Sequence, residues 1–339
     1  MIGETRPTMN DVARTAGVSL KTVSRVVNGE TTVAPDLAAR VHAAVESLNY
    51  RPHLGASMLR RNDRRTRTIG VLLEDVGNPF SSTLHRAIED EARAHGVQVL
   101  TGSLDEDPQR ERELAAAFAQ RHADGLIIAP AGPDQSYLGS LPDIPVVFVD
   151  RPGTGFAGDS VLATNVSGSQ DAVRHLVAQG HRRIAYLGDH FRVSTARERH
   201  RGYLAALTAA GLSPFAERKL RHSSYAESAT LALFDRPEPP TALFTSQNLI
   251  TVGAVHALHS VGRQHEVALA GFDDVQFGET LDPAITVVAQ DTVTIGRTAS
   301  ERLFARINGD RSPARVYTID SHLITRGSGE LPLTTRRTE

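Results

Sequence analysis

From residue 68 onward, short apolar runs alternate with longer amphipathic stretches, and this alternation limits the chain to a small set of folds. The apolar runs have the length of buried strands and lie at 69–73, 97–100, 126–129, 146–149, 184–187, 242–245 and 267–270. The stretches with helical spacing lie at 81–95, 109–121, 168–180, 196–211, 226–234, 248–261 and 292–307. Strands that alternate with helices form parallel sheets. Because about 270 residues exceed one ordinary core, we expect more than one sheet.

Residues 8–50 have a different pattern, that of short helices with very little chain between them. Thr8 precedes Asp11 by three positions, which resembles a capping box at the start of a helix. Gly17 ends this helix, and Ser19 caps a second one over 20–27. Since only two residues separate the helices, they must cross sharply, as in a helix-turn-helix.

A third helix is expected to start near Pro35, a residue that the first helical turn tolerates. Tyr50 and Pro52 are expected to end it. Its apolar positions recur every three or four residues and would close a small core, at Leu37, Val41, Val45 and Leu48.

The polar face of the second helix determines what this headpiece can bind. Lys21 and Arg25 can donate hydrogen bonds to guanine, whereas Leu20 offers only apolar contact. Short polar side chains that suit phosphate oxygens are Ser19, Thr22, Ser24 and Asn28, and Thr8 is a further candidate DNA contact. A solvated helix face that touches nothing is the alternative.

Residues 8–19 read TMNDVARTAGVS, residues 22–29 read TVSRVVNG, and residues 48–52 read LNYRP. These segments resemble the headpiece of the lactose/galactose-repressor family of bacterial transcription regulators, and the resemblance extends more diffusely through the rest of the chain. It implies that Leu20, Lys21 and Arg25 read bases. Because Leu20 forms no hydrogen bond and Lys21 is less directional than an arginine, the operator sequence does not follow from these residues.

Residues 51–67 are expected to be a linker off DNA, because Gly55 and the shortness of the segment make a lone helix marginal in water. The resemblance implies that this segment folds into a hinge helix on DNA and pairs with a dimer mate near Ala56. It also implies that Leu59 inserts into the minor groove. Arg60 and neighbouring arginines would add attraction to phosphates.

For residues 68–339, the resemblance implies a periplasmic-binding-protein-like domain of two α/β lobes, which binds an effector and forms the dimer. The expected fold is therefore α + α/β: a helix-turn-helix headpiece over 1–50, a hinge helix and linker over 51–67, and this two-lobed domain. We expect the chain to cross between lobes near 150–166, 290–292 and 321–326. A ligand would lie between the lobes, at the carboxyl ends of strands.

Several segments that follow predicted strands carry candidate ligand contacts. They are Asn78, Phe80, Asp150, Arg151, Thr195, Arg197, Arg199, Gln247 and Asp273. The resemblance gives ligand contact to Arg199 and Asp273 in particular. An arginine, a carboxylate and an aromatic ring suit a sugar, and a purine is the other open class. Structural roles are the alternative: Asn78 and Asp273 as helix caps, Phe80 as core, and Arg197 and Arg199 as solvated side chains.

The family commonly has Asn-Asp after the strand at 242–245, whereas this chain has Gln247-Asn248, which leaves the ligand class open. The nucleotide-binding, nucleophile-elbow and metal motifs that mark common enzymes are absent, and so is Cys. We therefore expect no enzyme, cofactor or metal, although an α/β enzyme, for example a sugar or nucleotide hydrolase fused to a DNA-binding head, is an open alternative. No apolar run reaches the ~18 residues of a membrane span, and no signal-peptide core is present, which favours the cytoplasm.

The formal net charge of −2 hides an uneven distribution. Residues 1–67 hold 11 Lys/Arg and 6 Asp/Glu, whereas the remainder holds 26 and 33. A basic head on an acidic body indicates a nucleic-acid-binding segment joined to another function. We predict a homodimeric, ligand-responsive repressor of a pseudo-palindromic operator in double-stranded DNA. The alternative is a solute-binding protein without DNA-binding activity.

Overall fold

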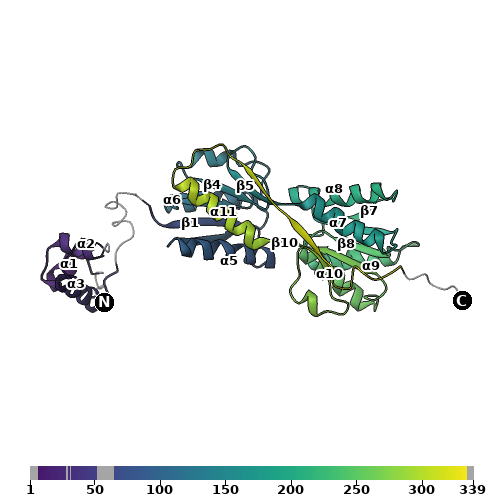
Figure 1. Cartoon of the computed structure of the whole chain (residues 1–339), viewed down its shortest axis with the longest axis horizontal. Helices are drawn as coiled ribbons and strands as arrows, with labels where there is room; N and C mark the ends of the chain where they lie inside the picture. The colour runs from purple at the N-terminus through teal and green to yellow at the C-terminus, as the bar shows by residue number, and fades with distance from the viewer. Residues whose placement is uncertain (1–6, 28–29, 31, 52–64, 334–339) are drawn as a thin grey trace. The chain divides into compact units, whose positions relative to one another are not determined.

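The computed structural model describes residues 7–27, 30, 32–51 and 65–333 (Figure 1). Two compact units divide between Thr66 and Arg67. The first unit is helical and the second is α/β, which confirms the predicted α + α/β class, whereas the predicted hinge helix over 51–67 lies almost wholly outside the described residues. Among the described residues, no helix is both long enough and apolar enough to span a bilayer.

The first unit consists of three helices, α1 (Met9–Ala16), α2 (Leu20–Val27) and α3 (Pro35–Ser47). Asp11 N donates to Thr8 Oγ1 at 3.3 Å and Thr8 N donates to Asp11 Oδ2 at 2.9 Å, so the capping box is present. Gly17 has a φ of 62°, the left-handed conformation that ends α1 and permits the sharp turn into α2. The core of this unit consists of the buried residues Val12, Ala16, Val23, Val26, Val41, Ala44 and Tyr50.

The second unit contains two six-stranded sheets, each in its own lobe (Figure 1). The first sheet is wholly parallel, with the order β11-β5-β4-β3-β1-β2. Its strands are β1 (Thr68–Leu73), β2 (Gln98–Ser103), β3 (Gly125–Ile128), β4 (Val146–Val149), β5 (Asp159–Ala163) and β11 (Val316–Ile319). The helices of this lobe are α5 (Pro79–Ala94), α6 (Pro108–Gln120) and α11 (Thr292–Ile307), with a short 3-10 turn at Ser136–Ser140.

The second sheet has the order β12-β10-β9-β8-β6-β7, and only β12 is antiparallel to its neighbour among these described strands. Its strands are β6 (Ile184–Leu187), β7 (Phe215–Glu217), β8 (Ala242–Thr245), β9 (Ala268–Phe272), β10 (Thr286–Gln290) and β12 (Ser321–Ile324). The helices are α7 (Asn165–Ala178), α8 (Ser194–Ala209), α9 (Ser223–Phe234) and α10 (Asn248–Ser260), with a 3-10 turn at Gly278–Thr280.

The chain passes between the lobes at three points. It leaves the first sheet after Ala163 and enters α7 at Asn165, and it returns between Gln290 and Thr292. The third passage lies at Asp320, between β11 and β12, and Figure 1 shows this segment running from one lobe to the other. The third passage was expected at 321–326, but Ser321 already pairs with Gln290 in the second sheet.

All seven predicted strands and all seven predicted body helices are present, with ends that differ by a few residues. One expectation about burial is wrong: β2 is not a buried strand, because it lies at the edge of its sheet and is partly exposed. Five strands were not predicted. Among them β7, β11 and β12 are short and partly exposed, and β5 begins with the polar pair Asp159 and Ser160.

Candidate functional site

The outward face of α2 carries the residues that we expect to contact DNA. Leu20, Lys21 and Arg25 are exposed, whereas Val23 and Val26 pack into the headpiece core. Arg25 Nε lies 3.4 Å from Glu30 Oε2, an exposed pair that solvent screens and that costs little to break. The base-reading candidates are therefore accessible together on one helix face.

The short polar residues of the headpiece have local partners as well. Thr22 N donates to Ser19 Oγ at 3.1 Å, so Ser19 caps α2. Thr8 is occupied in the capping box of α1, and Ser24 is half-buried. Asn28, Ala56, Leu59 and Arg60 lie outside the described residues, so their DNA contacts stay predictions from the resemblance.

A cavity of about 440 Å³ lies between the two lobes of the second unit. Eight of the nine candidate ligand contacts line it: Asn78, Phe80, Asp150, Arg151, Thr195, Arg199, Gln247 and Asp273. They are contributed by both lobes, and most follow the carboxyl ends of parallel strands, as open α/β sheets favour for ligand binding. Their role in ligand binding remains a prediction.

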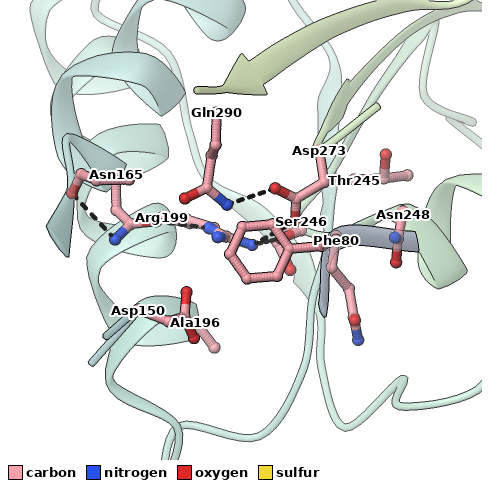
Figure 2. Close-up of polar contacts among 12 residues, drawn as sticks. Phe80, Asp150, Asn165, Ala196, Arg199, Thr245, Ser246, Asn248, Asp273 and Gln290 are labelled. Carbon is pink, nitrogen blue, oxygen red and sulfur yellow. Dashed lines mark hydrogen bonds and ion pairs between the residues drawn. The ribbon is translucent and has the colours of Figure 1, made fainter. Parts of the chain in front are cut away.

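Arg199 is the centre of the polar network in this cavity (Figure 2). Its Nε donates to Asn165 Oδ1 at 2.8 Å, and its Nη1 donates to Ser246 O at 2.8 Å and to Asp273 Oδ2 at 3.2 Å. The guanidinium also stacks 3.9 Å from the centroid of the Phe272 ring. Its Nη2 has no hydrogen-bond partner among the described residues.

Asp273 is fixed on its other side by a residue that the sequence did not indicate. Gln290 Nε2 donates to Asp273 Oδ1 at 2.5 Å (Figure 2). Asp273 has a φ of 67° where the chain leaves β9, so it does not cap a helix, and that alternative is wrong. Because Gln290 is the last residue of β10, the network reaches the point where the chain crosses between the lobes.

Two contacts across the cavity join one lobe to the other. Arg221 Nη2 donates to Glu74 Oε1 at 3.0 Å. Asn248 Nδ2 donates to Asn78 Oδ1 at 2.8 Å, and Asn78 Nδ2 donates back to Asn248 Oδ1 at 3.3 Å. Asn78 Oδ1 also accepts from Phe80 N at 3.0 Å, so Asn78 both caps α5 and joins the lobes. Any opening of the lobes must break these bonds.

The first lobe contributes buried ionisable side chains to the lining of the cavity. Arg151 Nη1 donates to Glu106 Oε2 at 2.8 Å and to Pro130 O at 3.0 Å, so Arg151 is already paired within its own lobe.

Burial raises the pKa of the neighbouring Asp150 carboxyl, although Arg151 and Arg199 oppose this shift. Burial and the nearby Glu106 carboxylate raise the pKa of Glu74 to about 7, against the attraction of Arg221. The cavity therefore holds carboxyl groups that resist ionisation.

Arg197 is the one candidate that does not reach the cavity. Its side chain is exposed, and its Nη1 donates to Phe191 O at 2.6 Å and to Arg192 O at 3.0 Å. Residues two apart on a helix point to different faces, so Arg197 and Arg199 cannot both face the cavity from α8. Its predicted ligand contact has no support in this geometry.

Several residues that line the cavity were not predicted from the sequence. Glu74, Glu106, Asp189 and Ser246 follow strands closely, so the strand-end criterion that selected the other candidates would have found them. Arg221 lies just before α9 and carries no such signal, because only folding brings it to Glu74. No group of three or more His, Asp or Glu side chains among the described residues has the geometry of a metal site.

Comparisons with known proteins agree with this architecture. Residues 66–327 match the family described as periplasmic binding proteins and sugar binding domain of the LacI family, and residues 8–53 match bacterial regulatory proteins of the lacI family. The HTH-type transcriptional regulator PtxS of Pseudomonas aeruginosa is 34% identical over 330 residues, which cover 95% of this chain and 96% of that protein. The ribose operon repressor of Escherichia coli is 32% identical over 331 residues, which cover 95% and 99% of the two chains.

The solved structure of the Lac repressor dimer bound to operator and the anti-inducer ONPF has a TM-score of 0.83 and 26% identity. The match covers 96% of this chain and 99% of that chain. The two family matches together span the headpiece and the two-lobed body, and the relatives match over nearly their whole length. This chain therefore belongs to the LacI family of DNA-binding bacterial transcription regulators.

Proposed function

We propose that this regulator is a repressor that binds a pseudo-palindromic operator as a homodimer, and that a sugar between its lobes controls this binding. The exposed face of α2 supplies the groups that read bases. A two-fold symmetric dimer presents two such helices and therefore favours an operator with two related half-sites. Its action belongs in the cytoplasm, where bacterial DNA is located.

The observation that carries the proposal is that both lobes line one cavity and bond across it. A ligand there contacts Arg199 and Asp273 in the second lobe and Phe80 and Asp150 in the first. Such a ligand binds one arrangement of the lobes better than another, so it shifts the equilibrium between them. The headpiece is joined to the first lobe by the chain. A change in the arrangement of the lobes therefore alters the free-energy cost of binding two headpieces of a dimer to one operator.

The charges of the cavity favour a neutral sugar. Seven acidic residues line the cavity, against three arginines: Glu74, Asp75, Asp105, Glu106, Asp150, Asp189 and Asp273, against Arg151, Arg199 and Arg221. Burial raises the pKa of Glu74 and of Asp150, but the other five carboxylates alone outnumber the arginines. Each arginine is already paired with a carboxylate, so an anionic ligand would meet uncompensated negative charge. Hydroxyl groups can donate to these acceptors.

A nucleobase fits this cavity less well than a sugar. Phe80 and His222 are the only residues with aromatic rings among the described lining residues, and the cavity is otherwise lined mainly by polar and charged groups. A sugar needs one aromatic face and many polar partners. The lining of the cavity therefore favours a sugar, a preference that Gln247 and Asn248 alone do not indicate.

The ligand assignment is tested by thermal unfolding of the full chain with a panel of neutral sugars, sugar acids and nucleobases. A ligand at 100 times its dissociation constant stabilises the folded state by about 2.7 kcal/mol. The shift from the best ligand should disappear in Arg199→Met and fall in Gln247→Ala, because the Gln247 side chain lines the cavity and forms no hydrogen bond within the described residues. Arg201→Gln is the matched control, because Arg201 is exposed on the same helix.

The outcomes of this screen separate the three ligand classes. A shift by neutral sugars that needs Arg199 supports the proposal. A shift by nucleobases or sugar acids alone contradicts the sugar assignment, and a shift that survives Arg199→Met contradicts the cavity assignment.

Operator binding is tested by a gel shift with the DNA upstream of the coding region, titrated with salt. We expect a sequence-selective complex whose affinity falls steeply with salt, because phosphate contacts release counterions. The alternative, a solute-binding protein without DNA-binding activity, predicts a ligand-induced thermal shift and no such complex.

A further inference from the structure

The amino-terminal edge of the sheet in the first lobe is basic, although the body as a whole is acidic. All strands of this sheet run parallel, so the residues that precede them share one edge. Five arginines lie there, and we call them the basic edge: Arg67 before β1, Arg93 and Arg121 at the ends of α5 and α6, and Arg311 and Arg315 before β11. All five are exposed.

Backbone hydrogen bonds fix the positions of these residues along the edge. Arg67 O accepts from Gln98 N at 2.8 Å, and Arg315 O accepts from Ser160 N at 2.9 Å. The edge therefore extends across the sheet from β2 to β11, and it lies at the opposite ends of the strands from the cavity.

The arginines of the basic edge are not neutralised by the described residues. No described carboxylate forms a salt bridge with any of the five, whereas the nearby Arg302 and Arg306 are paired with Asp159 at 3.2 and 2.9 Å. The other acidic residues at this edge are Asp124, which accepts from Arg67 N at 2.7 Å, the exposed Asp143, and Asp310, which is paired with Arg302. Together with Asp159 they are four carboxylates, against the five arginines of the basic edge and the paired Arg302 and Arg306. Positive charge therefore exceeds negative charge along this edge.

Helix stabilisation does not account for this arrangement. A basic residue near the end of a helix interacts favourably with the helix dipole, which explains Arg93 and Arg121. Arg67, Arg311 and Arg315 precede strands and belong to no helix. At the other ends of the strands, by contrast, the lobe contributes an excess of carboxyl groups to the cavity, among them Glu74, Glu106 and Asp150. The two ends of this lobe therefore carry opposite charge, a difference that the net charge of the whole body does not show.

We propose that the basic edge binds the phosphate backbone of DNA that flanks the operator. The chain arrives from the headpiece at this edge, because Arg67 immediately precedes β1. Only residues 52–64 separate the described end of the headpiece unit from the segment that leads into β1, so the basic edge is the part of the body that follows the headpiece most directly in the chain. Exposed guanidinium groups bind phosphate without reading sequence. This inference rests on the proposed operator binding and extends it beyond the half-sites.

The test compares the full chain with the triple variant Arg121→Gln/Arg311→Gln/Arg315→Gln. The control is Arg182→Gln/Arg192→Gln/Arg201→Gln, which removes the same charge from exposed positions of the second lobe. Affinity is measured by fluorescence anisotropy against salt concentration, on the operator alone and on the operator with flanking duplex. The double variant Arg67→Gln/Arg93→Gln repeats the test at the other end of the edge. Thermal unfolding checks that each variant is folded.

We expect flanking duplex to raise wild-type affinity and to steepen its salt dependence. The edge variants should lose this increment, with the slope of log affinity against log salt falling by roughly 0.9 for each phosphate that the variant no longer neutralises. On the operator alone they should bind like the wild type. An unchanged slope on flanked DNA, or an equal loss in the control, would overturn the inference. Failure of the wild type to bind any operator would instead overturn the proposed function and this inference with it.

Discussion

Replacement of Arg199 by methionine tests whether one buried ion pair organises the cavity. Arg199 is 5% exposed and bonds Asn165, Ser246 and Asp273. Methionine keeps much of the side-chain volume but removes every donor, so three acceptors lose a partner. The second perturbation, Asp273→Asn, removes the negative charge that the first one leaves unpaired.

The expected magnitude follows from these contacts. Breaking one side of a buried pair costs about 3–5 kcal/mol, because the other charge stays buried without compensation. Because Gln290 still donates to Asp273 at 2.5 Å, we expect Arg199→Met to lower the free energy of unfolding by an amount near the lower end of this range. Asp273→Asn removes the unpaired charge. The free energy of unfolding that the double variant loses should therefore be smaller than the sum of the two single losses, by at least about 1 kcal/mol.

The assay is urea unfolding of the full chain followed by far-ultraviolet circular dichroism, since the sequence has no Trp to report by fluorescence. Arg201→Met, on the exposed face of the same helix, is the control and should change stability by less than about 0.5 kcal/mol. Two results would refute the reasoning: additive effects of Arg199→Met and Asp273→Asn, or a cost for Arg199→Met as small as that of the control.

Three further predictions concern other parts of the chain. Because the pKa of Glu74 is raised to about 7 from 4.5, its contribution to stability is full below pH 4.5 and lost as pH rises through 7. That loss is about 3 kcal/mol, and unfolding measured from pH 4 to 8 should show it in the wild type but not in Glu74→Gln. Thr8→Ala should destabilise the headpiece by about 1 kcal/mol through loss of the capping box, with faster amide exchange in α1; unchanged exchange would contradict it. Leu59→Ala should weaken operator binding far more than binding to unrelated DNA, and equal losses on both would exclude a wedge in the minor groove.

The fold was largely predictable because its buried strands are apolar on both faces. Apolar runs such as 146–149 and 242–245 are best interpreted as buried strands once helices are seen to alternate with them. Edge strands are different: β7 and β11 have a neighbour on one side only, are three and four residues long, and are partly exposed, so they lack the buried apolar run by which the other strands were found. The local signals of the headpiece, above all Thr8 and Gly17, were sufficient to place its turns.

The candidate site was only partly predictable, because strand ends indicate which segments meet but not which side chains point inward. Arg197 and Arg199 follow the same strand, and only the resemblance favoured Arg199 over Arg197. The helical phase of α8 is what turns Arg197 away from the cavity. The hydrogen bond between Glu74 and Arg221 joins residues of different lobes that are far apart in the chain. No local pattern encodes such a pair, since it depends on how the lobes meet.

The most direct test of the account is the reciprocal effect of ligand and operator on each other's binding. Operator affinity is measured with and without a saturating amount of the best ligand, and ligand affinity with and without operator, in the wild type and in Gln247→Ala as a variant with weakened ligand binding. A coupling free energy of about 1–3 kcal/mol predicts a 5- to 150-fold change in operator affinity, with an equal change in ligand affinity. A ligand that binds the cavity with full dependence on Arg199 and leaves operator affinity unchanged would contradict the central claim.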